Sequence, residues 1–232
     1  PFLLLRLRGG DHIAVLDNTG WEYEVAVARV ARDYVTGVIC GKRTVAEPGT
    51  RITLYQALLK GSKFEFILQK CTELGVSGFI PVLCERCVAG HPRDKKARRW
   101  QRIIAEAAEQ SGRGKLPTLE PAVPFPQACR AAAAFSLLAW EGKGASGLRP
   151  ALRSEIYRQR IISGKNSLSV NLFIGPEGGF SPFEVEFARG CGILPISLGS
   201  RVVRAETTGL VAATAILYEC GDLEPPISSA IA

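Results

Sequence analysis

The chain has 232 residues, of which 47% are hydrophobic and 22% are charged, and its formal net charge is +7. This length allows one or two domains with a substantial core, and no apolar run approaches the ~20 residues that a membrane-spanning helix needs. Phe2–Leu5 is too short for the core of a signal peptide, and arginines follow it. The seven cysteines therefore predict reduced thiols in a cytoplasmic protein rather than the disulfides of a secreted one.

Residues 13–54 alternate between apolar and polar residues in the manner of short β-strands. The predicted strands are Ile13–Leu16, Tyr23–Ala28, Val35–Ile39 and Arg51–Tyr55, with turn residues between them. Several short strands at this spacing predict a small all-β barrel or sandwich. We assign residues 1–60 to this first domain.

From Gly61 the pattern changes to strands that alternate with helices. The predicted helices are Lys63–Leu74, Lys95–Ser111, Leu148–Ile162, one that starts after Ser181, and Glu206–Cys220. The predicted strands are Phe79–Leu83, Phe135–Trp140, Leu168–Ile174 and Ile193–Leu198. Ser62 with Glu65, and Ser181 with Glu184, match the capping box that starts a helix. This alternation predicts an α/β domain with a parallel sheet over residues 61–232.

Two of these strands are followed by a glycine-bearing loop and then by a helix. The first loop is Gly175-Pro-Glu-Gly-Gly179, and the second starts at Leu198-Gly199 and leads to Arg204. At the carboxyl edge of a parallel sheet, such loops bring free backbone groups together where small ligands bind. Neither loop has the pattern of a phosphate-binding loop, so we expect a cofactor held through its base and a charged tail. A tight turn without a ligand is the simpler explanation of the first loop taken alone.

Five blocks of the chain, in the same order, resemble the RsmE family of 16S rRNA uridine-N3 methyltransferases, which belongs to the SPOUT superfamily. The blocks are Leu4–Asp11, Lys70–Val76, Glu106–Arg113 with Leu116–Pro117, Asn171–Ser181, and Leu198–Gly209. The resemblance implies a PUA-like β-barrel followed by an α/β domain with a deep trefoil knot. It also implies S-adenosylmethionine as cofactor, 16S rRNA of the small ribosomal subunit as partner, and a homodimer. Since family members carry further residues before the first strand, we expect the barrel to be incomplete here.

The resemblance also implies the roles of particular residues. The expected cofactor pocket consists of Ile174, Gly175, Glu177, Gly179, Leu198, Gly199, Val203, Arg204 and Thr207. Glu177 is expected to hold the loop, to face the sulfonium charge, or to do neither. For the chemistry itself, we take Arg204 and Arg113 as the candidates for stabilising negative charge on the uracil. No residue is a clear general base, and Glu106 is the one that we name. Gln110, Arg113 and Arg6 are expected to contact RNA.

Residues 86–115 carry nine Lys or Arg against three Asp or Glu. This surplus fits either an ordinary solvated helix face or a face that binds RNA phosphates. The RNA-binding candidates in this segment are Lys95, Lys96, Arg98 and Arg99.

Other motifs carry less weight. Gly142–Gly147 matches G-x-G-x-x-G but lacks the acidic residue that a dinucleotide site needs about 20 positions later. Cys84-x-x-Cys87 with His91 lacks a second ligand pair for zinc, so we expect no metal. Two functional alternatives stay open: a SPOUT methyltransferase that modifies another RNA nucleotide, and a non-catalytic RNA-binding factor on the same fold.

Overall fold

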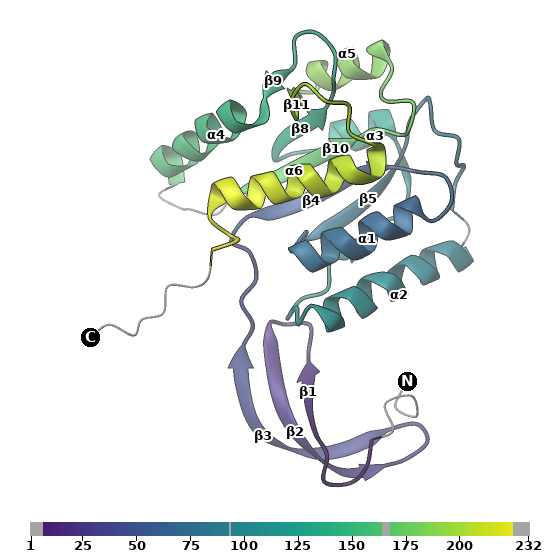
Figure 1. Cartoon of the computed structure of the whole chain (residues 1–232), viewed down its shortest axis with the longest axis vertical. Coiled ribbons are helices and arrows are strands. Elements are labelled where there is room, and N and C mark those ends of the chain that lie inside the picture. Colours follow the sequence, from purple (N-terminus) through teal and green to yellow (C-terminus); the bar gives the residue numbers. More distant parts are fainter. Residues whose placement is uncertain (1–6, 93, 164–167, 225–232) are drawn as a thin grey trace. The chain divides into compact units, whose positions relative to one another are not determined.

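The structure, a computed structural model, describes residues 7–92, 94–163 and 168–224 of the chain. These residues form two compact units, which Figure 1 shows with their elements labelled. Within the described residues, the first unit comprises residues 7–47 and 108–116, and the second comprises residues 48–107 and 117–224. No helix in the described part of the chain is long and apolar enough to cross a membrane. Arg6, an RNA-binding candidate, lies outside the described residues.

The first unit contains a three-stranded antiparallel sheet in the order β1-β2-β3. Its strands are β1 (His12–Leu16), β2 (Trp21–Val30) and β3 (Val35–Thr44). The segment Ala108–Leu116 belongs to this unit because backbone and side-chain bonds tie it to the β1–β2 turn. The Gly20 N–H donates to the Gly114 carbonyl at 3.1 Å, and the Leu116 N–H donates to Asn18 Oδ1 at 2.6 Å.

The second unit is built on an eight-stranded sheet in the order β6-β5-β4-β10-β8-β11-β9, with β7 also paired to β5. Every pairing in this sheet is parallel, which confirms the predicted α/β class. The strands are β4 (Arg51–Ala57), β5 (Gly78–Leu83), β6 (Thr118–Leu119), β7 (Val123–Pro124), β8 (Phe135–Ala139), β9 (Ser146–Gly147), β10 (Ser169–Ile174) and β11 (Leu194–Ser197).

The strand Arg51–Ala57 differs from the sequence-based assignment, which placed it in the N-terminal domain. It is β4, and it pairs with β5 on one side and β10 on the other. Its side chains are buried on both faces of the sheet, from Ile52 and Leu54 to Tyr55 and Ala57. A strand covered on both faces usually has a nearly continuous apolar sequence. In this strand the polar residues Thr53 and Gln56 interrupt that sequence, as they would in a strand with one exposed face. The domain boundary therefore lies before β4 rather than at residue 60.

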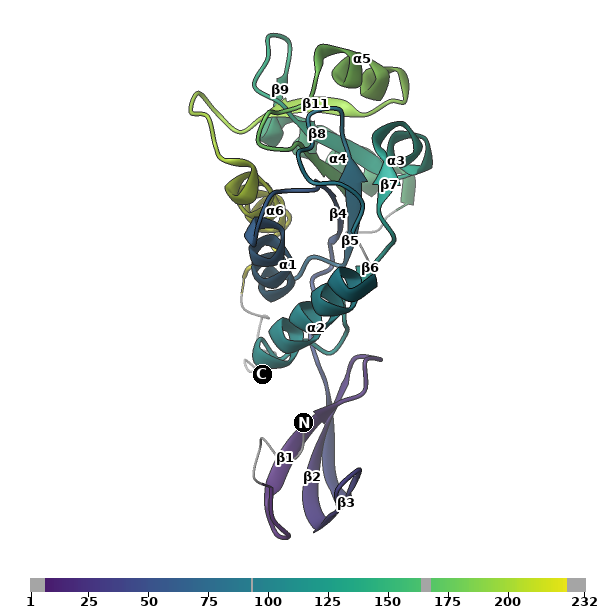
Figure 2. The same ribbon diagram turned by 90° about the vertical axis from the view of Figure 1, so that its right-hand side faces the viewer.

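Helices cover both faces of this sheet. They are α1 (Lys63–Leu74), α2 (Asp94–Gln110), α3 (Phe125–Ala131), α4 (Leu148–Ser163), α5 (Pro182–Gly190) and α6 (Ala205–Cys220). One core cluster joins the sheet to α1, α2, α4 and α6, with Phe64 and Trp100 as its largest members. A second cluster joins the other face to α3 and α5 through Phe125 and Val185. Figure 2 shows α1 and α6 on one side of the sheet and α3 on the other.

The two predicted capping boxes have different outcomes. At the start of α5, the Glu184 N–H donates to Ser181 Oγ at 3.3 Å, and the Ser181 N–H donates to Glu184 Oε2 at 2.9 Å, so this box is confirmed. At the start of α1, Ser62 makes no side-chain cap bond, and the prediction is wrong. The backbone of Ser62 is helical, with φ −87° and ψ 0°, whereas a capping residue is extended. Glu65 accepts a hydrogen bond from Arg99 Nη2 on α2 at 2.8 Å instead.

Candidate functional site

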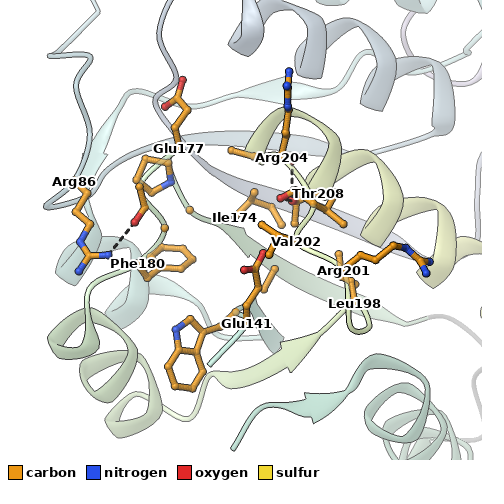
Figure 3. A pocket seen from close by; sticks show the side chains of 18 of the residues that line it. Arg86, Glu141, Ile174, Glu177, Phe180, Leu198, Arg201, Val202, Arg204 and Thr208 are labelled. Carbon is orange, nitrogen blue, oxygen red and sulfur yellow. Dashed lines mark hydrogen bonds between the residues drawn. The ribbon is translucent and has the colours of Figure 1, made fainter. Parts of the chain in front are cut away.

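The carboxyl ends of β10, β8 and β11 meet at one edge of the sheet and form a cavity of about 440 Å³. In the sheet, β8 lies between β10 and β11 and pairs with both of them. Figure 3 shows the cavity with the side chains that line it. The lining residues are Arg86, Ala139–Glu141, Ile174–Phe180, Leu198, Gly199, Arg201–Ala205 and Thr208. Of the nine predicted cofactor-binding residues, all but Thr207 are in this set.

Glycines shape the backbone of both loops at this edge. Gly179 has φ +66° and Gly199 has φ +116°, a region that L side chains rarely adopt. A Cβ at either position would meet no protein atom within 4 Å, so the backbone there faces open space. A Cβ at Gly175 would lie 3.3 Å from the Phe180 backbone nitrogen, a contact closer than most Cβ atoms make. The loops therefore leave backbone groups accessible to a ligand.

Glu177, one of the lining residues, anchors the first loop through its carboxylate. Its Oε1 accepts a hydrogen bond from the Lys60 N–H at 3.2 Å and from Lys63 Nζ at 3.3 Å. Figure 3 shows its carboxylate directed away from the other lining side chains. Burial alone would raise the pKa of the Glu177 carboxyl, but the backbone N–H groups of Glu177 and Lys60 and the Lys63 ammonium together lower it below its ordinary value.

Arg86, which belongs to none of the sequence motifs, holds the same loop from another side. It follows β5, and its Nη1 donates to the Gly178 carbonyl at 2.9 Å. The preceding Glu85 N–H donates to Glu184 Oε1 at 2.8 Å, which ties this turn to the start of α5. No local pattern around Arg86 predicts this contact, since its partner lies 92 residues away in the chain.

The second loop ends where α6 begins, and Arg204 is the N-cap residue of that helix. The backbone N–H groups of Thr207 and Thr208 both donate to the Arg204 carbonyl, at 2.8 and 2.9 Å. The Thr208 hydroxyl donates to the Val203 and Arg204 carbonyls at 3.1 and 2.9 Å. Successive helical residues point about 100° apart, and it is Thr208, not the predicted Thr207, that lines the cavity.

Comparisons with known proteins match this architecture. The profile of the RNA methyltransferase domain family matches residues 46–217. The ribosomal RNA small subunit methyltransferase E of Bacillus subtilis is 32% identical over 222 residues, which cover 93% of this chain and 85% of that protein. The chain belongs to this RNA methyltransferase family.

Other relatives also match this chain in sequence, and two of them match it in structure. The ribosomal RNA small subunit methyltransferase E of Synechocystis is 36% identical over 212 residues, and the match spans 90% of this chain and 66% of that relative. A putative methyltransferase of Legionella pneumophila, solved with bound S-adenosylmethionine, superposes with a TM-score of 0.79 at 31% identity and covers 93% of this chain and 86% of that one. The small subunit methyltransferase E of Neisseria gonorrhoeae, also bound to S-adenosylmethionine, gives a TM-score of 0.79 at 27% identity, with 94% and 86% coverage.

Arg204 is a candidate catalytic residue, and it lies at the rim of this cavity. Its side chain is exposed and makes no hydrogen bond or ion pair with another described residue. An arginine that leads into a buried helix needs a partner for its charge. The structure leaves that need unmet within the described chain, so the guanidinium is available to a ligand or to RNA.

Lys63 connects the two halves of the site. Besides Glu177, its Nζ lies 3.6 Å from Glu206 Oε2, in the first turn of α6. That oxygen is buried and has no hydrogen-bond partner among the described residues. Lys63 therefore links the loop after β10 to the helix that follows the loop after β11.

Two predicted catalytic residues lie elsewhere. Arg113 is buried in the first unit, where its Nη2 donates to Glu47 Oε2 at 2.7 Å. Because only 8% of the Arg113 side chain is exposed, the structure does not support its assignment to RNA and uracil. Glu106 is exposed on α2, accepts from Arg102 Nε at 2.8 Å, and is not among the residues that line the cavity. An ordinary ion pair one helical turn apart accounts for it.

The RNA-binding candidates on α2 are on the surface, to different degrees. Lys95, Arg98 and Gln110 are exposed, and their side chains contact no other described residue through a hydrogen bond or ion pair. Lys96 is half-buried with its Nζ 5.3 Å from the Trp100 ring centroid, and Arg99 is bonded to Glu65. No group of His, Cys, Asp and Glu side chains in the described part of the chain could hold a metal ion.

Proposed function

We propose that this protein transfers a methyl group from S-adenosylmethionine to N3 of a uridine in 16S rRNA. The observation that carries the proposal is the cavity at the carboxyl ends of β10, β8 and β11, in a chain of the RNA methyltransferase family. The names of its relatives support ribosomal RNA of the small subunit as the substrate. The choice of uridine N3 rests on the resemblance to the RsmE family.

The cavity fits such a cofactor in size and in chemistry. Its volume of about 440 Å³ lies within the range of roughly 300–1,000 Å³ that is usual for small-molecule sites. Ile174, Leu198 and Val203 supply apolar walls for a base, and the backbone at Gly179 and Gly199 faces open space where a side chain would fill the site. Bound S-adenosylmethionine supplies an activated methyl group on its sulfonium.

The residues of the chain then have two tasks, to position the reactants and to stabilise charge. The loops after β10 and β11 position the cofactor, and Glu177, Lys63 and Arg86 hold the first of them in place. Methylation at N3 requires loss of the N3 proton, which leaves negative charge on the uracil oxygens. The exposed Arg204 guanidinium, a permanent cation, is the group we assign to that charge. The target uridine must be unpaired, since N3 takes part in Watson–Crick pairing.

The surplus of positive charge on α2 is assigned to the phosphates of the RNA. Lys95 and Arg98 are the best placed of the four basic candidates, because neither has an anionic partner among the described residues. Their contribution does not depend on base sequence and weakens with salt. The protein is expected to act as a homodimer, with the exposed Val211 and Tyr218 of α6 as apolar surface for the partner.

The test is nucleoside mass spectrometry on unmodified small-subunit particles incubated with the protein and S-adenosylmethionine. The expected result is 3-methyluridine in the 16S rRNA. A different methylated nucleoside would keep the enzyme class and reject the N3 assignment. Absence of any methylation by a folded protein would favour the non-catalytic RNA-binding alternative.

A further inference from the structure

Glu141 is a charged residue of the cavity that neither the sequence motifs nor the proposed mechanism uses. It lies two residues after the end of β8, the strand between β10 and β11, so it stands between the two glycine-bearing loops. Figure 3 shows its side chain directed into the group of residues that line the cavity. Two carboxylates line this cavity, and Glu177 is already engaged by Lys63. Glu141 makes no hydrogen bond or ion pair with another described residue.

The backbone on both sides of Glu141 is well held. The Trp140 N–H donates to the Ile196 carbonyl at 2.8 Å, which continues the sheet as far as that residue. The Trp140 ring occupies the space of a Gly142 side chain, since a Cβ there would lie 2.0 Å from a ring carbon. The Arg189 guanidinium lies 5.5 Å from the Trp140 ring centroid. These contacts hold the turn that carries Glu141, so a ligand meets a carboxylate whose backbone is already fixed.

We infer that Glu141 binds the ribose hydroxyls of the cofactor and so selects for a ribonucleoside. A carboxylate has two acceptor oxygens, which match the two donors of a vicinal diol. In dinucleotide-binding sheets, an acidic residue beyond a glycine-rich loop binds ribose in the same way. Leu198 and Ile174 line the cavity on the two flanking strands and supply the apolar surface that a base needs. This inference rests on the proposed function, since it assumes that the cavity takes S-adenosylmethionine.

The test compares binding of three ligands by calorimetry to the full chain and to Glu141→Ala. The ligands are S-adenosylmethionine, S-adenosylhomocysteine, and the 2′,3′-dideoxy analogue of S-adenosylhomocysteine. Hydrogen bonds to a charged group contribute enough that the Kd of the first two ligands should rise about 10- to 100-fold in the variant. The dideoxy analogue should bind the two proteins equally, because it lacks the groups that Glu141 recognises.

The other outcomes overturn the inference. A loss confined to S-adenosylmethionine would mean that Glu141 faces the sulfonium, and a loss shared by the dideoxy analogue would mean that it faces the amino-acid tail or the adenine. Equal affinity of both proteins for all ligands would remove Glu141 from the site. Failure of the unaltered chain to bind any of them would instead reject the proposed function.

Two further variants keep the result interpretable. Glu141→Gln preserves the shape of the side chain and is expected to weaken binding in the same pattern, to a smaller extent. Glu120→Ala removes an exposed carboxylate that does not line the cavity, and it should leave all three Kd values unchanged.

Discussion

Two arginines of this protein, each next to the end of a helix, have opposite environments. Arg204 follows a glycine-bearing loop and precedes α6, and Arg113 lies between two glycines after α2. Arg204 is exposed at the rim of the cavity without a partner in the described chain, whereas Arg113 is buried against Glu47. A buried charge must be paired by the protein itself, and a paired charge has little left to offer a ligand. The contrast separates an arginine that serves the fold from one that is free for function.

The largest expected effect is on turnover, from Arg204→Ala. Removing one preorganised group that stabilises developing charge lowers turnover by about 100- to 1,000-fold, while the melting temperature stays unchanged because the side chain is exposed. Arg204→Lys should keep part of the activity, since it keeps the charge but not the planar fork. Single-turnover methylation of small-subunit particles measures both.

Arg130→Ala, which removes an arginine of α3 that does not line the cavity, is the matched control for this prediction. Near-normal turnover of Arg204→Ala would withdraw its catalytic assignment.

Arg113→Ala should act on stability instead. The substitution leaves the largely buried Glu47 carboxylate without its guanidinium partner. We expect the free energy of unfolding to fall by about 2 kcal/mol. This is below the full cost of breaking a buried pair, because part of Glu47 is exposed to water. Denaturant unfolding followed by a probe in the first unit measures this change. The double variant Glu47→Gln with Arg113→Ala should recover part of the lost stability, because no unpaired charge remains. A stable Arg113→Ala protein that has lost RNA affinity would reverse our assignment.

The same distinction applies to neighbouring arginines of α2. Arg98 has no partner in the described chain, whereas Arg99 is bonded to Glu65. Replacing Lys95 and Arg98 together by Glu should lower RNA affinity about tenfold and flatten its dependence on salt. Arg99→Ala should have a smaller effect. Titration of labelled rRNA fragments at several salt concentrations measures the slope, and unchanged affinity in the double variant would make this helix an ordinary solvated face.

The smallest expected effect comes from the ion pairs that hold the first loop. Lys63→Met removes the link from Glu177 to Glu206, and partly exposed pairs of this kind contribute only about 0.5–1 kcal/mol. The Kd for S-adenosylmethionine should therefore rise by about two- to fivefold, with Lys63→Arg close to the unaltered protein. A change of more than tenfold would mean that Lys63 contacts the cofactor itself.

Acidic pH tests the same contacts. The pKa of Glu177 is lowered in the folded protein. The stabilisation that its ionised carboxylate gives to the folded loop is therefore present above the ordinary carboxyl pKa of about 4.3, and it is lost as the pH falls through the lower folded pKa. Glu177→Gln should remove this part of the pH dependence of cofactor binding.

The features that the sequence predicted well depend on the backbone. Glycines such as Gly179 and Gly199 permit the positive φ that both have in the structure. The strand–loop–helix order predicts that their loops meet at one edge of the sheet. Ser181 and Glu184 form their predicted cap because both groups belong to one turn of chain. Ser62 and Glu65 have the same spacing, but the Ser62 backbone is helical and Glu65 bonds to Arg99 of a distant helix instead.

The sequence by itself determined the parallel α/β class and the two glycine-bearing loops, because these follow from local periodicity and from residues that permit particular backbone angles. The predicted cofactor-binding residues of those loops came from the family resemblance, and eight of the nine line the cavity. Only the tertiary structure decided which charged side chains belong to the site. It buried Arg113 against Glu47, left Arg204 free, and brought Arg86 and Glu141 to the cavity from other strands. The physical reason is that the role of a charge depends on its partners, and those partners lie tens of residues away in the chain.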